Sequence, residues 1–346
     1  MTRLALYTAG TKFITLIVDT AVRQIDACGH WLRFDKPAHV MPVVDLARDL
    51  VYRIPRAQNG IDEIDVSNPN ALTRTHLATS DNANLLCAAL SYGQNAPQQS
   101  ESRLFCGSHD GQIFTFPLAP NGKTRKTDSE PAAYNVTDAQ GNPIVDLAVS
   151  DDGTYAFALV QRQDGRPALV TQTFGPTPRS TYSGRPAWDT IENPRWVSLS
   201  PDRRHILVTS DKNNKYTIVD TTKNEARAYE GPAMSWAACR PVCHNKTAYY
   251  ISCSYTFFDT SIRSVAAVDL QSGAWKGSAD ARGATLWAVG DRYLIWVDQD
   301  RGAEMLEFGD TRTDVVPVLN NCGPGKTDDA VGDRSFPPGA LVDAAY

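Results

Sequence analysis

The stretch from Arg195 to Tyr229 decides the fold. It reads RWVSLSPDRRH over 195–205, ILVTS over 206–210, KYTIVD over 215–220 and EARAY over 225–229. Each run is short and rich in β-branched or aromatic residues, and residues typical of tight turns, such as Pro, Asp and Asn, separate the runs. The stretch therefore predicts four consecutive strands joined by hairpin turns.

The same order of strands recurs along the chain. The preceding unit begins with IVDLAVSDDG at 144–153, continues with YAFAL at 155–159 and has its third strand at 168–174. Further units begin near residues 4, 43, 85, 235 and 286, so the unit starts are spaced by about 47 residues on average. This spacing is typical of β-propeller blades, and we find no stretch of about twelve residues with helical periodicity.

A repeated four-stranded unit favours a closed ring. One such unit cannot bury both of its faces, so neighbouring units must stack and the series must return to its start. We therefore predict an all-β fold, a single β-propeller of about seven four-stranded blades over residues 1–319. The inner strands after the first unit are expected at 43–47, 85–90, 144–149, 195–199, 235–239 and 286–289.

Residues 320–346 depart from this pattern. They are rich in Gly and Pro and include NNCGPGKTDD at 320–329 and FPPG at 336–339. We expect an irregular C-terminal tail that lies outside the blades, is dispensable for folding and contributes to partner binding. The sequence GPGKT at 323–327 is similar to part of a phosphate-binding loop, but no helix-forming sequence follows it, so we expect no nucleotide site.

One family resemblance rests on the same residues. The run VSLSPDRRHILV at 197–208, followed by YTIVD at 216–220, resembles the WD40-like and YVTN-type β-propeller superfamily, and LFCGSHDGQIF at 104–114 repeats the pattern. The Trp-Asp repeat ending and the Gly-His opening of WD40 repeats do not recur here in regular register. The resemblance implies the propeller fold and a bias towards binding functions, and nothing finer.

Composition and charge argue against several classes of protein. The net charge is −5 and no basic run occurs, so we expect no nucleic-acid partner. No apolar stretch reaches the roughly 18 residues of a membrane span, and residues 8–12 interrupt the N-terminal apolar run that a signal peptide would need. The seven cysteines are odd in number and widely scattered, which indicates reduced thiols. We therefore expect a soluble protein of the cytoplasm or of a virion.

Candidate catalytic and metal-binding groups have simpler structural explanations. Cys239, Cys243 and His244 lack the second ligand pair that a zinc site needs. The sequence Ser108–Asp110 contains the residue types of a catalytic triad, but residues adjacent in one turn do not have triad geometry. We therefore assign no catalytic, cofactor-binding or metal-binding residue, and we expect no cofactor.

Three tryptophans are candidates for a binding face. Trp196, Trp236 and Trp287 occupy equivalent positions at the starts of predicted inner strands in three successive units. They either pack between blades or form an aromatic ring around the mouth of the central channel, where large rigid side chains serve as anchors for a partner.

The lack of a complete catalytic motif favours a non-catalytic role. The leading hypothesis is a protein-interaction scaffold or a structural component of a larger assembly, such as a phage tail or nozzle component of a virion, with protein subunits as partners. The alternative is a lactonase-like or hydrolase-like enzyme with its site at one mouth of the channel. An enzyme should show a polar funnel with shifted carboxylates or histidines there, whereas a scaffold should show an exposed apolar or aromatic patch.

Overall fold

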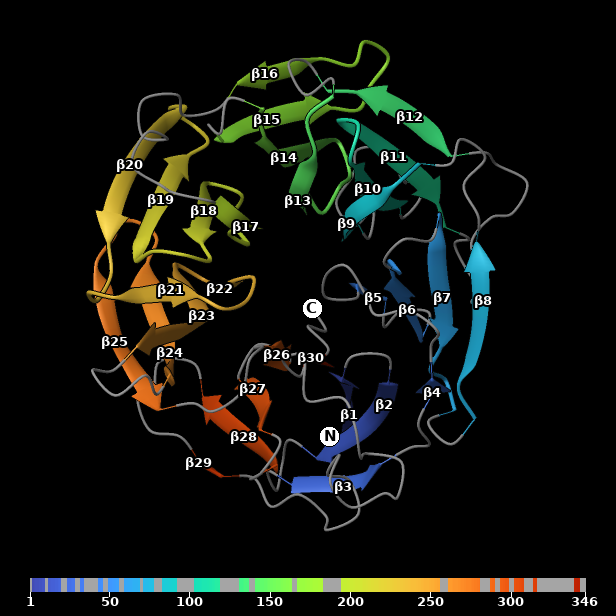
Figure 1. Ribbon diagram of the computed structural model, residues 1–346, viewed down its shortest axis with the longest axis vertical. Helices are drawn as coiled ribbons and strands as arrows, with labels where there is room; N and C mark the ends of the chain where they lie inside the picture. The colour runs from blue at the N-terminus through green and yellow to red at the C-terminus, as the bar shows by residue number, and fades with distance from the viewer. Residues whose placement is uncertain are drawn as a thin grey trace.

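A computed structural model shows how the chain folds (Figure 1). It describes residues 2–9, 12–19, 24–28, 32–33, 43–45, 49–55, 59–68, 71–77, 83–91, 103–118, 131–136, 141–163, 167–182, 194–255, 261–280, 287–289, 293–298, 302–307, 314–315 and 339–342. Side chains are described within these ranges between residues 43 and 276, apart from residues 44, 255 and 261–263, and at Leu294. No helix occurs among the described residues, so the all-β prediction is confirmed there.

The described strands form seven antiparallel sheets, arranged one after another in a ring (Figure 1). The first sheet contains β1 (Thr2–Ala9), β2 (Lys12–Asp19), β3 (Gln24–Cys28), β4 (Leu32–Arg33) and β30 (Gly339–Val342). The second contains β5 (Val43–Asp45), β6 (Leu50–Arg53), β7 (Ile61–Asp65) and β8 (Thr73–Leu77). The third contains β9 (Leu85–Ser91), β10 (Arg103–Ser108), β11 (Gln112–Pro117) and β12 (Ala132–Asn135).

The other four sheets continue around the ring. The fourth contains β13 (Ile144–Val149), β14 (Tyr155–Gln161), β15 (Pro167–Thr173) and β16 (Ser180–Tyr182). The fifth contains β17 (Pro194–Leu199), β18 (His205–Ser210), β19 (Lys215–Asp220) and β20 (Glu225–Glu230). The sixth contains β21 (Ser235–Ala237), β22 (Val242–His244), β23 (Thr247–Tyr255), β24 (Ser261–Asp269) and β25 (Trp275–Asp280). The seventh contains β26 (Trp287–Val289), β27 (Tyr293–Asp298), β28 (Gly302–Glu307) and β29 (Asp314–Val315).

The predicted inner strands stand at the inner ends of their sheets. β5, β9, β13, β17, β21 and β26 each begin a sheet and lie towards the centre of the ring, which confirms the expected order (Figure 1). The first sheet differs, because its inner position is taken by β30, which pairs antiparallel with β1. The ends of the chain therefore meet in one sheet. The boundary that we placed after residue 319 stays a prediction, but the sequence analysis did not anticipate a strand beyond it.

Strand β14, in the interior of the fourth sheet, is apolar on both faces because a neighbouring sheet packs against each face. In β14, Ala156, Ala158 and Val160 join a buried cluster shared with the third sheet. Phe157 and Leu159, which point the other way, join a cluster shared with the fifth sheet. Alternate residues of one strand thus serve two interfaces, and the sequence reads as a continuous apolar run rather than as an alternating one.

Two successive units contain the same hairpin turn between their first two strands. The Ser150 hydroxyl lies 2.6 Å from a carboxylate oxygen of Asp152, and Ser200 and Asp202 repeat this contact at 2.6 Å. The turns need a left-handed residue, which is Gly153 at φ 66° in the first and Arg203 at φ 61° in the second. A non-glycine residue costs free energy in this conformation, but Arg203 also reaches back to Asp152 with an N–O distance of 3.1 Å. The turn therefore also links neighbouring sheets.

A turn aspartate in the sixth sheet is tied down in the same way. Asp269 accepts hydrogen bonds from the backbone nitrogen of Ser272 at 2.8 Å and forms an ion pair with Lys276 at 2.8 Å. Partial burial acts to raise the pKa of Asp269, but the Lys276 ammonium and the Ser272 donors outweigh it and hold this pKa well below its usual range. The charged carboxylate therefore stabilises the hairpin between β24 and β25.

Gly107 in β10 marks a close approach between the third and fourth sheets. A Cβ atom at this position would lie 2.6 Å from Cγ2 of Ile144 and 2.7 Å from Sγ of Cys87. Both contacts are far shorter than a van der Waals separation, so only glycine lets the inner parts of these sheets come this close.

Candidate functional site

A buried ion pair joins the inner strands near the axis of the ring. Asp146 on β13 is fully buried, and its carboxylate accepts a hydrogen bond from the backbone nitrogen of Val197 on β17 at 2.8 Å. Arg240, which follows β21, donates to the same carboxylate through Nη2 and through Nε, the latter at 3.1 Å. Its Nη1 also lies 3.5 Å from the carbonyl oxygen of Ala88 on β9. One guanidinium and one carboxylate therefore link the third, fourth, fifth and sixth sheets.

The ion pair controls the charge of its surroundings. Burial disfavours the charged form of Arg240, but the carboxylate of Asp146 outweighs this effect and raises the pKa of the guanidinium. Nearby, burial and the charge of Asp146 raise the pKa of the Cys87 thiol well above its usual range, although Arg240 and Arg195 act to lower it. Cys87 therefore stays a neutral thiol, its Sγ 3.4 Å from the carbonyl oxygen of Ile144, and is not a nucleophile.

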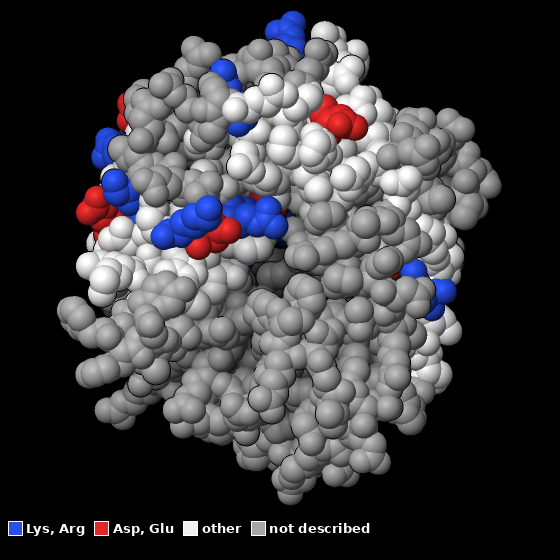
Figure 2. All heavy atoms as spheres, viewed as in Figure 1, with Lys and Arg blue, Asp and Glu red and all other residues white. Residues whose placement is uncertain are grey.

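A cavity of about 330 Å³ opens between the fourth and fifth sheets beside this ion pair. Figure 2 shows basic side chains, with acidic ones among them, gathered beside the central hollow on one face of the ring. The cavity is lined by Val145, Val160, Gln161, Pro167, Pro194, Arg195, Asp211 and Lys212. One wall comes from β13, β14 and β15, and the other from β17 and the turn between β18 and β19.

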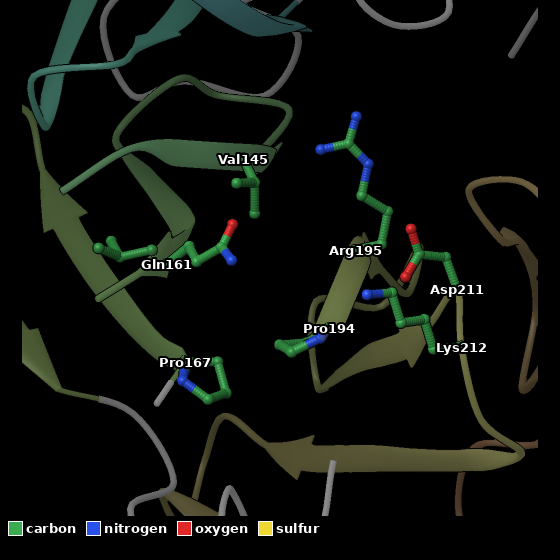
Figure 3. A pocket seen from close by; sticks show the side chains of 8 residues that line it. Val145, Gln161, Pro167, Pro194, Arg195, Asp211 and Lys212 are labelled. Carbon is green, nitrogen blue, oxygen red and sulfur yellow. The ribbon is translucent and has the colours of Figure 1, made fainter. Parts of the chain in front are cut away.

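The lining carries two cations and one anion. Within the part of the chain that the structure describes, Arg195, Lys212 and Asp211 form no ion pair. In Figure 3 the Gln161 amide faces the space between Val145 and Arg195, while the Asp211 carboxylate and the Lys212 ammonium lie on the Arg195 side. Val145 is buried and forms an apolar part of the opposite wall. The arrangement is therefore a small polar pocket with charged groups on one side.

A second cavity of about 550 Å³ lies between the same two sheets, where it borders β15, β16 and β19. Its lining combines the aromatic rings of Tyr155 and Phe157 with several hydroxyl groups, including those of Thr171 and Thr173. The two rings pack edge to face at 5.3 Å, and the Thr173 hydroxyl bonds to the backbone of Arg179. These polar groups therefore serve the local structure of the sheets.

The three predicted tryptophans stand on inner strands, but their role stays a prediction. Trp196 lies on β17 beneath the guanidinium of Arg195, which is 5.2 Å from the ring centre, and Trp236 lies on β21. Both are half-buried. Trp287 lies on β26, and its side chain falls outside the described residues. Trp196 therefore touches a residue that lines the cavity.

The other sequence candidates have structural roles where they are described. Ser108 is buried, and its hydroxyl accepts a hydrogen bond from the backbone nitrogen of Gln112 at 3.0 Å, while His109 is exposed. Cys239 is buried, and burial raises the pKa of the Cys243 thiol to about 12. The sequence at 323–327 lies outside the described residues. Among described residues, no cluster of three or more histidine, cysteine or acidic side chains meets the geometry of a metal site.

Sequence analysis missed Arg195, Lys212, Asp146 and Arg240. Arg195 directly precedes a candidate tryptophan, which was its only signal. Lys212 and Asp211 stand in a sequence typical of a hairpin turn, and charged residues in turns are ordinary. The partners Asp146 and Arg240 are 94 residues apart, so no local pattern could connect them.

Comparisons with known proteins define the fold and no more. The chain matches no protein-family model and no curated protein. It is similar to the structure of a protein from Lactobacillus plantarum, with a TM-score of 0.60, 13% identity and coverage of 92% of this chain and 97% of that one. A putative 6-phosphogluconolactonase from Bacteroides uniformis is similar with a TM-score of 0.58, 14% identity and coverage of 91% of this chain and 97% of that one. The structure of apo AztD from Citrobacter koseri is similar with a TM-score of 0.55, 11% identity and coverage of 99% of both chains.

At these identities the likeness shows a β-propeller fold alone, which agrees with the superfamily resemblance in the sequence. No described helix is long and apolar enough to cross a lipid bilayer.

Proposed function

We propose that this β-propeller is a non-catalytic binding protein, a scaffold or assembly component that recognises its partner through the charged mouth of the ring. The observation that carries the proposal is the pair of cations, Arg195 and Lys212, which line a cavity without an ion-pair partner in the described structure. Charged groups placed at a surface without an internal partner favour recognition of a complementary partner.

The composition of the cavity supports binding over catalysis. Among the described residues that line it there is no histidine, cysteine, serine or threonine, and Asp211 is the one carboxylate. General acid–base catalysis needs a group held and activated by its neighbours. Asp211 is exposed in a turn, and no described side chain forms a hydrogen bond or ion pair with it. The carboxylates with lowered pKa, such as Asp152 and Asp269, are held instead by hairpin turns.

The exposed surface indicates that contacts with a partner are mainly polar. Among the described residues, Met234 is the one large hydrophobic side chain that is strongly exposed, at 61%. The apolar patch that we expected of a scaffold is therefore not found in the described part, and charge must supply more of the recognition. Complexes of this kind form quickly and weaken as salt screens the charges.

The experiment is affinity capture from the native source at low and high salt, followed by size-exclusion chromatography with light scattering. We expect a defined complex at low salt that is lost when Arg195→Glu and Lys212→Glu are combined. Lys223→Glu, a matched charge reversal in the exposed turn between β19 and β20, should leave the complex intact. Equal capture by the wild type, the double variant and Lys223→Glu would show that Arg195 and Lys212 do not contribute to partner binding.

The lactonase alternative has its own test. One similar structure carries the name of a putative lactonase, but at 14% identity this supports the fold alone. A panel of lactones and esters should give no turnover above the buffer rate. Turnover that disappears in Asp211→Asn or in His109→Ala, with the circular dichroism spectrum unchanged, would replace the binding proposal with an enzymatic one.

A further inference from the structure

We propose that the cavity between the fourth and fifth sheets binds a carboxylate group that carries a hydrogen-bond donor beside it, as in a hydroxy acid, an amino acid or the C-terminal residue of a peptide. This inference rests on the proposed binding function and specifies the chemistry of its site. It follows from the charges of the lining, their placement and the size of the cavity.

Arg195 and Lys212 make the site selective for anions. A guanidinium presents a fixed fork of donors that matches the two oxygens of a carboxylate, and an ammonium adds a point charge. Arg195 is already oriented, because its guanidinium lies 5.2 Å from the centre of the Trp196 ring. The buried side chain of Val145 lowers the local dielectric beside the cavity, so an anion is attracted more strongly here than at an open surface.

Asp211 narrows the choice among anions. The three charged side chains among the described lining residues sum to one positive charge, which a monoanion neutralises and a dianion exceeds. The Asp211 carboxylate lies on the Arg195 side of the cavity, so a phosphate dianion would be repelled there (Figure 3). A ligand with a hydroxyl, ammonium or amide donor next to its carboxylate satisfies Asp211 as well. The Gln161 amide, which faces the same space, can donate or accept.

The volume sets the size of the group that is bound. At about 330 Å³ the cavity is near the lower end of the range of roughly 300–1,000 Å³ for small-molecule sites. It therefore accepts a free small acid, or the carboxylate end of a residue from a partner protein, but not a whole folded segment. Both sources share one chemistry, and the experiment separates them.

Isothermal titration calorimetry on the full chain tests the site with five probes. These are L-lactate, propionate, L-glutamate, inorganic phosphate and a short acetylated peptide with a free C-terminal carboxylate and no charged side chain. We expect lactate to bind more tightly than propionate, which has the same carboxylate without the hydroxyl donor. Binding of the peptide alone would identify a partner protein as the source, and binding of the free acids would identify a small molecule.

Three variants locate the binding. Arg195→Met should weaken the carboxylate probes by about tenfold or more, because one charge-assisted hydrogen-bond pair is lost. Lys223→Met, a matched exposed lysine outside the cavity, should change nothing. Asp211→Asn should raise the affinity for phosphate relative to that for lactate, and it should reduce the difference in affinity between lactate and propionate. This change in preference is a readout that general damage to the fold would not produce.

The result that overturns the proposal is equally specific. Absence of binding by all five probes at millimolar concentration, or equal binding by wild type and Arg195→Met, would remove the site. If the salt-sensitive complex of the binding proposal persists in that case, the mouth recognises its partner without this cavity. If instead lactone turnover is found, the proposed function fails while carboxylate binding in the cavity still stands as a product site.

Discussion

The ion pair between Asp146 and Arg240 should be the polar interaction on which the inner ring depends most. We propose to measure it with Asp146→Asn, Arg240→Met and the combined variant. Asp146 has no exposed side-chain surface, while a quarter of the Arg240 side chain is exposed. The two residues therefore respond differently to the loss of their partner.

The expected magnitudes follow from these exposures. Arg240→Met leaves a buried carboxylate with the Val197 backbone donor as its remaining described hydrogen bond, and loss of one member of a buried pair costs about 3–5 kcal/mol. Water can enter where Arg240 reaches the surface, so we expect about 3 kcal/mol. Asp146→Asn keeps an acceptor for Val197 and leaves a cation that can turn to water, for about 2 kcal/mol. The combined variant should cost about 3 kcal/mol, clearly less than the two single effects added.

Urea unfolding measures these differences. Tryptophan fluorescence and circular dichroism should give coincident transitions, because the free energies are meaningful only for two-state unfolding. The exposed pair Lys215 and Glu230, 3.8 Å apart, is the control and should show no measurable coupling. Additive effects of Asp146→Asn and Arg240→Met would refute the reasoning, since they would mean that the two side chains do not stabilise each other.

Three further predictions concern stability. Gly107→Ala should lower the melting temperature, because its Cβ would lie 2.6 Å from Ile144, whereas Gly175→Ala, with no atom within 4 Å, should not clash. Asp269→Asn should lower the urea midpoint of unfolding at pH 7. Because the pKa of Asp269 is depressed in the folded state, the contribution of its carboxylate to the free energy of unfolding is complete above about pH 4. The difference in urea midpoint between wild type and variant should vanish as the pH falls through the folded-state pKa. Truncation after Leu319 should lower the melting temperature, since β1 loses β30; an unchanged value would show the tail to be dispensable.

The strand order was predictable because each sheet is built from residues close in sequence. Consecutive antiparallel strands joined by short turns carry their own signals, such as SDDG at 150–153, where Gly153 has the left-handed conformation that the hairpin turn needs. The pairing of β1 with β30 joins residues at opposite ends of the chain, and a short run such as Ala340–Val342 has no local feature that indicates its partner. Sequence reasoning therefore predicted the units and missed the strand that joins the ends of the chain.

The site was harder to predict because its residues meet only through the ring. Trp196 was singled out because tryptophans recur at the starts of three predicted inner strands, but the charged residue before it proved more informative. Successive side chains of a strand point to opposite faces of its sheet. On β17, Arg195 therefore reaches the cavity, while Trp196 lies half-buried beneath the Arg195 guanidinium. Which neighbours a side chain meets there depends on the adjacent sheet, about 50 residues away, and periodicity within one unit contains no such information.

The axial ion pair and the cavity are mechanically connected. Val145, in one wall of the cavity, precedes Asp146, and Arg195, in the other wall, lies two residues before Val197. The hydrogen bond from the Val197 backbone to the Asp146 carboxylate thus joins β13 to β17 directly beside the cavity. Arg240 holds that carboxylate in place through two hydrogen bonds, so it positions the two walls without touching a ligand. Arg240→Met should therefore weaken carboxylate binding as well as stability, and Arg240→Lys, which restores the charge but not the fork, should recover only part of either. If binding in Arg240→Met equals that of the wild type while stability falls, the spacing of the walls does not depend on the ion pair.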